Sequence, residues 1–308
     1  MQCENNPDDP EGICLTCKKV TPSKAARFPC LRYKITDIKL YKPGQVPGFE
    51  WTRRWSQNLG EPIQKWASTE IRIIRVSEGY SSKGVDLRVR KFVPVEGDKL
   101  ERSWVHNGLR RSVQVPAYAA VDLSQAKASY AKYIKESMEE TIKTVTRDAN
   151  PLLHQVYTQA WSEAINESNS KETLEVLQLA LRLWTSIRVT TKSSFIVSDD
   201  TLGMPKDILD DTSPTPGKVP LPPVLGAQLE MVLIQQIQAN LRRELLDKFQ
   251  RFILRNKNIN WFATFLVTVI LLHNTALIIA HDASYAVKHG IKVSFIYVKQ
   301  SDVLLMKL

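Results

Sequence analysis

Cysteine and histidine are both scarce in this chain of 308 residues. It has four cysteines, none of them after residue 30, and five histidines, none in the H-E-x-x-H spacing of zinc peptidases. It also lacks the G-x-S-x-G turn of hydrolases, the Walker phosphate loop and the glycine pattern that binds dinucleotides. These absences exclude the common enzyme classes, and we expect a protein that is not an enzyme.

A secretory signal is missing as well, because residues 1–12 are polar and acidic and contain no apolar stretch. This absence argues against disulfides, which belong to oxidising compartments, among Cys3, Cys14, Cys17 and Cys30. The prolines around the cysteines argue against the strand and helix that flank a thioredoxin-type redox pair. Zinc binding is the interpretation that we favour, and chemically inert thiols are the remaining alternative.

The spacing of the cysteines supports a zinc site. Cys14 and Cys17 form a C-x-x-C pair, and two thiolates on one tight turn can reach a tetrahedral zinc ion together. Ten residues separate Cys3 from this pair and twelve separate the pair from Cys30. Both spacings are longer than those of an ordinary zinc ribbon, although the outer cysteines can complete the zinc shell.

The N-terminal sequence resembles the fungal binuclear zinc cluster transcription regulators, in which six cysteines hold two zinc ions. The resemblance rests on Met1-Gln2-Cys3, Pro10, Cys14-Leu15-Thr16-Cys17-Lys18-Lys19 and Pro29-Cys30-Leu31-Arg32. The four cysteines are similar to the third, fourth, fifth and sixth of the family, and the first two have no counterpart. The resemblance therefore implies an incomplete cluster that holds one zinc ion or none.

The same resemblance implies DNA as a partner and the nucleus as the location. In the family, the helix that reads bases in the major groove lies in the stretch that has no counterpart. We therefore expect DNA binding that is weak or lost, with Lys18, Lys19 and Arg32 as candidate phosphate contacts. The net charge of +10 favours a polyanionic partner in general, although the basic residues are scattered along the chain.

We expect a mainly α fold, with an irregular N-terminal zinc-type segment, a small β-hairpin region and then a helical regulatory domain. Period-two alternation over 71–76 and 85–89, around a turn that contains glycine, predicts the hairpin, and a weaker strand is expected near 113–115. The predicted parts are a partial zinc-cluster segment (1–45), a linker and β-hairpin region (46–122), a helical region (123–193), a proline-rich flexible linker (194–223), C-terminal helices (224–290) and a tail that matches the regulators poorly (291–308).

Cap residues predict where three helices begin. Ser124 is the expected N-cap of a helix that runs to about residue 147. Asn150 followed by Pro151 predicts the start of the next helix, with asparagine at the cap and proline in the first turn. Asn169, with Glu172 three residues later, is typical of a capping box and predicts the third.

A long amphipathic helix is predicted over 225–256. Leucine or isoleucine recurs there at i+4 spacing, at Leu229, Leu233, Ile237, Leu241 and Leu245. We expect this stripe to pack into a helical core rather than to form a coiled-coil seam. The helix is also our candidate for contact with a protein partner.

Residues 261–280 contain no side chain that is charged at neutral pH and are long enough to cross a bilayer. His273 and Asn274 argue against a membrane span, because polar groups are costly to bury in lipid. The resemblance to the helical region of fungal regulators favours a buried core helix. We therefore predict a nuclear transcription regulator, and the alternative is a single-pass membrane protein anchored by 261–280.

Overall fold

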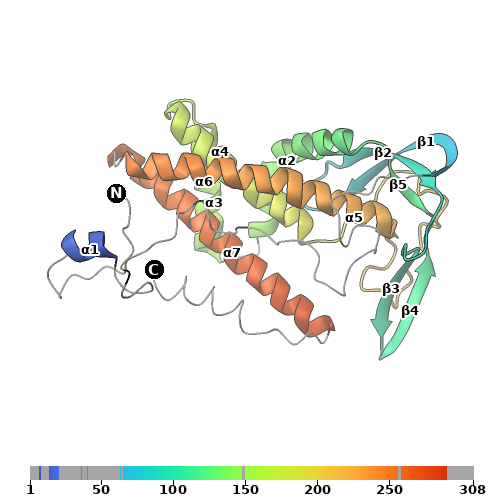
Figure 1. Cartoon of the computed structure of the whole chain (residues 1–308). Helices are drawn as coiled ribbons and strands as arrows, with labels where there is room; N and C mark the ends of the chain where they lie inside the picture. The colour runs from blue at the N-terminus through green and yellow to red at the C-terminus, as the bar shows by residue number, and fades with distance from the viewer. Residues whose placement is uncertain are drawn as a thin grey trace. The chain divides into compact units, whose positions relative to one another are not determined.

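The computed structural model describes 65–147, 150–255 and 258–289, with 14–20 and the single positions 7, 36, 40 and 63. The chain divides into two units, 1–38 and 39–308, and each is described by itself. The first unit contains the short helix α1 (Leu15–Val20), and the second contains all the other elements that are labelled in Figure 1.

The strands of the second unit are β1 (Trp66–Ser77), β2 (Val85–Phe92), β3 (Glu101–His106), β4 (Leu109–Gln114), β5 (Tyr118–Ala120), β6 (Phe195–Ile196) and β7 (Val219–Pro220). Its helices are α2 (Leu123–Thr146), α3 (Pro151–Ile165), α4 (Lys171–Thr190), α5 (Pro223–Met231), the π-helix η4 (Val232–Gln238), α6 (Ala239–Leu254), the short 3-10 helix η5 (Asn258–Asn260) and α7 (Trp261–His289).

An antiparallel hairpin of β1 and β2 forms the centre of a five-stranded sheet with the order β5-β2-β1-β6-β7. Val76 pairs with Val85 beside the turn, and buried side chains alternate with exposed ones along β2, as the pleat requires. This pairing confirms the predicted hairpin. The sheet is larger than predicted, however, and the fold is mixed α/β rather than mainly α.

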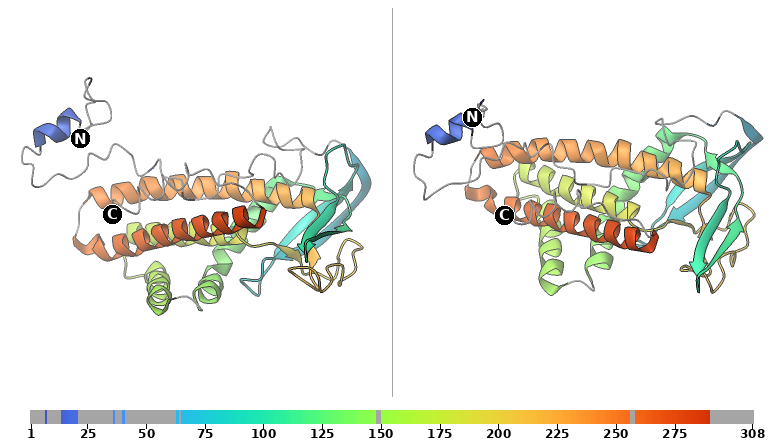
Figure 2. Two further views of the ribbon diagram at one scale, coloured as in Figure 1. Left: turned by 90° about the horizontal axis from the view of Figure 1, so that it is seen from below. Right: turned by 60° about the horizontal axis from the view of Figure 1, so that its bottom comes forward.

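Strands β3 and β4 form a separate two-stranded sheet. Asn107 and Gly108 connect them with φ angles of 50° and 76°, the left-handed conformations that a tight hairpin turn needs. Figure 1 and both views of Figure 2 show this hairpin as an arm beside the larger sheet. A hydrogen bond joins this hairpin to the stretch 194–223, because Nε1 of Trp104 donates to Oγ1 of Thr212 at 3.1 Å.

Helix α4 is the central helix of the second unit. It packs against α2, α3, α6 and α7, which surround it in Figures 1 and 2. Its C-terminal half is buried on nearly every side, and Leu181, Leu183 and Trp184 have no exposed surface. This burial explains why the apolar residues of α4 exceed a single stripe.

The helix starts confirm one of the predicted caps and correct two. Asn150 caps α3 as predicted. Asp122, rather than Ser124, caps α2, because its carboxylate accepts hydrogen bonds from two backbone N–H groups of the first turn. Ser170, rather than Asn169, caps α4, because the Asn169 amide donates instead to the last turns of α3.

Helices α5, η4 and α6 run without interruption over 223–254. The predicted i+4 stripe is buried along its whole length, which confirms its role in the core. The seven-residue π-helix was not predicted. It ends at Gln238, a fully buried side chain whose Nε2 donates to the Ser186 carbonyl at 2.9 Å and to Thr190 Oγ1 at 3.1 Å on α4.

The stretch 194–223 differs from the flexible linker that its prolines predicted. It contains β6 and β7, and Leu202, Met204 and Leu209 are buried within it. The backbone N–H of Val197 donates to the carbonyl of Arg75 at 2.8 Å, which extends the contact with β1. Prolines and turn residues here make a compact loop, because apolar side chains between the turns fix it to the sheet.

Candidate functional site

The C-x-x-C pair lies where α1 begins. Cys14 is fully buried, and the backbone N–H of Cys17 donates to its Sγ at 3.3 Å. The Lys18 N–H donates to the Cys14 carbonyl at 2.9 Å, which starts the helix. A backbone donor directed at sulfur favours the thiolate form, which is the form that binds metals.

The structure brings two of the four predicted zinc ligands together. Cys3, Cys30 and Arg32 lie outside the described residues. Lys18 and Lys19 are exposed in the last turn of α1, where positive charge suits the helix dipole. Within the described ranges, no group of three or more histidine, cysteine, aspartate or glutamate side chains is placed to hold a metal ion.

Helix α7 contains the apolar run that the sequence singled out. The stretch Asn258–Ala280, which covers η5 and most of α7, is long and apolar enough to cross a membrane by length and composition. The helix packs against α3 and α4, and Leu266, Val267 and Ile270 are almost completely buried. One face of α7 therefore belongs to the protein core.

The two polar residues in this run have partners on other parts of the fold. His273 Nδ1 lies 2.9 Å from the hydroxyl of Tyr157 on α3. Asn274 is 1% exposed, and its Nδ2 donates to the Leu40 carbonyl at 2.8 Å. Its Oδ1 accepts from a terminal nitrogen of Arg188 on α4 at 3.3 Å. Both polar atoms of the Asn274 amide and Nδ1 of His273 thus have partners inside the protein.

Arg188 is the charged member of this polar cluster. The guanidinium is 5.9 Å from the centroid of the Trp184 ring, and Tyr157 packs on the same ring with 4.8 Å between centroids. Burial lowers the pKa of Arg188. Burial, followed by the charge of Arg188, lowers the pKa of His273 to about 4, so His273 is neutral at physiological pH.

A second buried polar group joins the sheet to α2. The Tyr133 hydroxyl donates to Oε1 of Glu78 at 2.5 Å, and Glu78 is 4% exposed. Burial raises the pKa of Glu78, and hydrogen bonding to Tyr133 opposes that rise. The Lys192 charge acts in the same direction as Tyr133, and its Nζ lies 4.4 Å from the Tyr80 ring centroid.

Sequence reasoning singled out His273 and Asn274 and missed the other members of the two polar clusters. Arg188, Tyr157 and Glu78 were not among the predicted site residues. The signal for Arg188 was its place as the one charged residue of the sequence Leu183-Trp184-Thr185-Ser186-Ile187-Arg188-Val189. A charge inside such a run marks a side chain that the fold must bury or pair.

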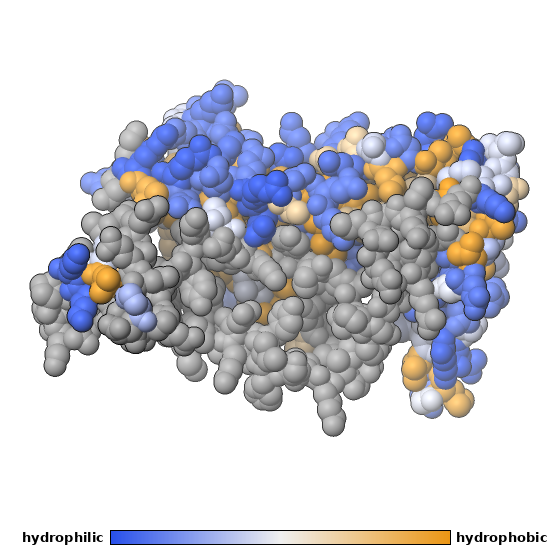
Figure 3. Space-filling model, viewed as in Figure 1, coloured by the Kyte–Doolittle hydropathy of each residue, from blue (hydrophilic) through white to orange (hydrophobic). Residues whose placement is uncertain are grey.

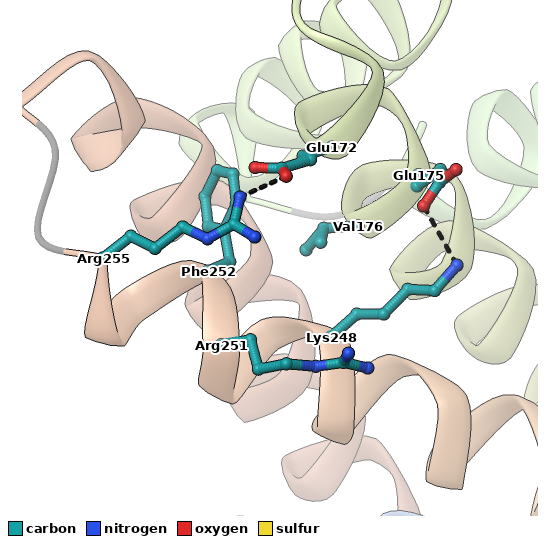
Figure 4. A pocket seen from close by; sticks show the side chains of 7 residues that line it. All are labelled: Glu172, Glu175, Val176, Lys248, Arg251, Phe252 and Arg255. Atoms are coloured by element: carbon teal, nitrogen blue, oxygen red, sulfur yellow. Dashed lines mark hydrogen bonds and ion pairs between the residues drawn. The ribbon is translucent and has the colours of Figure 1, made fainter.

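A pocket of about 150 Å³ lies between α4 and α6 (Figure 4). Ion pairs border it: Arg255 with Glu172, and Lys248 with Glu175 at 3.0 Å. Because these charges neutralise one another and are substantially exposed, the pocket favours no ligand of one charge.

The surface shows where polar and apolar side chains gather. Figure 3 shows hydrophilic side chains over α6, whose apolar stripe is turned into the core. Val105 and Leu109, near the tip of the β3–β4 hairpin, are 68% and 66% exposed. The exposed side of α6 therefore offers charged groups to a partner, and the hairpin offers apolar ones.

The sequence matches the KpeA transcription factor family over residues 41–303. It is also similar to the Satratoxin biosynthesis SC3 cluster transcription factor SAT20 of Stachybotrys chartarum, with 21% identity over 283 residues, which cover 88% of this chain and 37% of the relative. The chain thus spans little more than a third of that relative's length. No solved structure matches. Because the family match extends over most of the sequence, this chain belongs to the KpeA transcription factor family.

Proposed function

We propose that the chain regulates transcription in the nucleus, with nucleic-acid contact in the N-terminal unit and a regulatory role for the second unit. The observation that carries this proposal is the family match over 41–303. This range begins after the last cysteine, so the assignment to transcription does not depend on zinc. The proposed role is that of a regulator and involves no catalysis.

Zinc binding by Cys3, Cys14, Cys17 and Cys30 is a separate part of the proposal. It is supported by the burial of Cys14 and by the N–H donor that Cys17 directs at its sulfur. Four thiolates make a closed tetrahedral shell for one zinc ion, which would order the N-terminal unit rather than react. We therefore propose one zinc ion per chain, with a structural role.

The proposed DNA contact is electrostatic. Lys18 and Lys19 are exposed on α1, and with Arg32 they supply positive charge close in sequence to the cysteines. Contacts of this kind bind phosphates and add affinity with little preference for sequence. We therefore propose weak binding that falls steeply as the salt concentration rises.

Two measurements on the full chain test these parts independently. Metal analysis after purification under reducing conditions should give one zinc per wild-type chain and none for Cys14→Ser/Cys17→Ser. Fluorescence anisotropy with a duplex should show a slope of log affinity against log salt that falls by about 2 in Lys18→Ala/Lys19→Ala, since each phosphate contact contributes about 0.9. The lysine variant is the matched control for zinc, because it keeps every cysteine.

The outcomes separate the parts of the proposal. A wild-type chain without zinc would overturn the zinc site and leave the regulatory assignment intact. An unchanged salt slope in the lysine variant would remove Lys18 and Lys19 from the nucleic-acid surface. Recruitment to chromatin, measured by crosslinking and immunoprecipitation of the tagged chain, tests the regulatory role itself, and its absence would contradict that role.

Contact with a protein partner through 225–256 remains a proposal about the exposed side of α6. The apolar stripe is buried, so a partner would meet charged side chains such as Arg243 and Glu244 instead. Crosslinking from a photoreactive residue at position 243, with position 241 in the buried stripe as the control, would locate such a partner. Crosslinks from position 241 alone would contradict this surface.

Membrane anchoring by α7 is the second candidate, and the observation that favours it is the length and apolar character of Asn258–Ala280. The contacts of His273 with Tyr157 and of Asn274 with Arg188 support a core helix instead. Fractionation of cells decides between the two. Recovery of the chain only in the detergent-extracted membrane pellet would favour the anchor and contradict the nuclear proposal.

A further inference from the structure

Arg188 is a buried guanidinium with few partners. It is 5% exposed, and within the described part of the chain its side chain makes one hydrogen bond, the 3.3 Å bond to Oδ1 of Asn274. Its Nε is buried and donates to no atom of the described residues. A guanidinium carries five N–H donors in a fixed plane, so this environment leaves part of its donor capacity unused.

The charge of Arg188 is also uncompensated among the residues that the structure describes. The groups that interact with it electrostatically are Tyr80, Tyr157 and His273, and none of these is an anion at neutral pH. A buried cation is costly unless an opposite charge or a full set of acceptors replaces its hydration. A negatively charged group beside Arg188 would therefore stabilise the folded protein.

The nearby carboxyl group of Glu78 does not fill this role. Its Oε1 accepts the hydrogen bond from Tyr133, and Lys192 is the cation that interacts with it. Tyr80 lies within electrostatic range of both Glu78 and Arg188, and it is partly exposed on the turn between β1 and β2. Glu78 is thus engaged by Tyr133 and Lys192, and no ion pair joins it to Arg188 among the described residues.

We propose that Arg188 binds the carboxylate of a small organic anion, between α3, α4 and α7. The fork of a guanidinium matches the two oxygens of a carboxylate, and one negative charge neutralises the single cation. Asn274 holds one edge of the guanidinium, and the fully buried ring of Trp184 has its centroid 5.9 Å from the guanidinium carbon. A phosphate dianion would bring two charges against one in a buried place.

Thermal unfolding of the full chain tests this proposal, with formate, acetate and benzoate as probes and chloride and phosphate as comparison anions at constant ionic strength. Acetate should raise the midpoint saturably, by about 2–4 °C at tenfold above its dissociation constant. Arg188→Met should lose this response. Arg243→Met, on the exposed side of α6, is the matched control and should keep it.

A second variant keeps the test decisive if Arg188→Met does not fold. Asn274→Asp places a carboxylate where Oδ1 now lies 3.3 Å from the guanidinium, so it should occupy Arg188 internally and abolish the acetate response. The 19F linewidth of trifluoroacetate provides a direct readout: it should broaden with the wild-type chain and narrow again when acetate is added, but not broaden with Asn274→Asp.

Three results would overturn the proposal. These are no anion response in the wild type, an equal response in Arg188→Met, and a response to phosphate or chloride that matches acetate and also depends on Arg188. The last result would mean a general anion site rather than a carboxylate site. Since the measurements involve neither zinc nor DNA, they are independent of the tests of the proposed function.

Discussion

The hydroxyl of Tyr157 lies 2.9 Å from Nδ1 of His273, and the two rings meet edge to face with 5.4 Å between their centroids. This contact joins α3 to the middle of the apolar helix α7. It gives the partly buried imidazole a hydrogen-bonding partner inside the protein. The contact therefore links the titration of His273 to the packing of the helical core.

We predict that the free energy of unfolding falls as the pH is lowered from about 6.5 to about 4. The folded-state pKa of His273, about 4, is below its ordinary value of 6.5, so in this range the unfolded chain binds the proton more strongly. The contribution of neutral His273 to the free energy of unfolding is therefore fully present above pH 6.5. Because the ring is partly exposed, we expect a loss of about 1–3 kcal/mol.

Urea denaturation at pH 4.5, 5.5 and 7 measures this slope. His273→Gln should flatten it, since the amide does not titrate in this range. His106→Gln, on the β3–β4 hairpin, is the control and should keep the wild-type slope. An unchanged slope in His273→Gln would show that another group is responsible.

The Glu78 carboxylate should make the opposite contribution to pH dependence. Burial raises its pKa above 4.5, so the folded state holds the proton more strongly and stability falls as the pH rises through the folded-state pKa. The stability of Glu78→Gln relative to the wild type should therefore be higher at pH 8 than at pH 5. Denaturation at the two pH values tests this, and a larger gain at pH 5 would contradict it.

Removal of the Tyr133 hydroxyl should be costly because it leaves Glu78 buried without its donor. We expect Tyr133→Phe to lose about 1–3 kcal/mol at pH 7. The double variant Tyr133→Phe/Glu78→Gln should recover part of this loss, since the buried charge is then gone. Equal losses in the single and double variants would mean that the Glu78 charge is not involved.

The ion pair between Arg72 and Asp200 should contribute more than an exposed pair on the same strand. Arg72 contacts both Asp200 oxygens, at 2.8 and 2.6 Å, and each side chain is 27% exposed. Arg72→Lys loses the two-point contact, and we expect a cost of about 1 kcal/mol.

Arg75 and Asp86 provide the matched control for that pair. They also form two contacts, at 2.7 and 2.9 Å, but the side chains are 56% and 54% exposed. We expect Arg75→Lys to cost clearly less stability than Arg72→Lys, because solvent screens this exposed pair. Chemical denaturation measures both variants, and equal costs would show that burial does not set the strength of these pairs.

Substitution of Gln238, at the end of the π-helix, should lower the stability of the protein markedly. Its two donated bonds to α4 are lost in Gln238→Leu, for which we expect a cost of about 1–3 kcal/mol. Gln235→Leu, on the exposed side of the same segment, should change stability by less than about 0.5 kcal/mol. Similar effects of the two variants on the denaturation midpoint would contradict a specific role for Gln238.

Local patterns in the sequence were sufficient for several elements of the fold. Alternation identified the β1–β2 hairpin, and the i+4 stripe identified the long helix over 223–254. Both signals report which side chains one element must bury, and that depends on neighbours along the chain. The helix start at Asn150 was equally local, because a cap bonds to its own first turn.

The candidate sites followed less well from sequence. The C-x-x-C spacing pointed to the turn where Cys17 donates to Cys14, because two thiols three residues apart share one turn. No local pattern could show that Arg188 meets Asn274, since the two are 86 positions apart in the sequence. Strands β6 and β7 were missed for the same reason, because each is only two residues long and exists through its pairing.

The sequence by itself thus determined where the cysteines lie, which helices are amphipathic and which central strands pair, since these depend on residues close together in the chain. The tertiary structure decided that the apolar run of α7 lies against α3 and α4, with His273 and Asn274 bonded to other parts of the fold, and that Arg188 is buried without an anion among the described residues. Burial and pairing depend on what surrounds a side chain in space, and only the packed helices establish those surroundings.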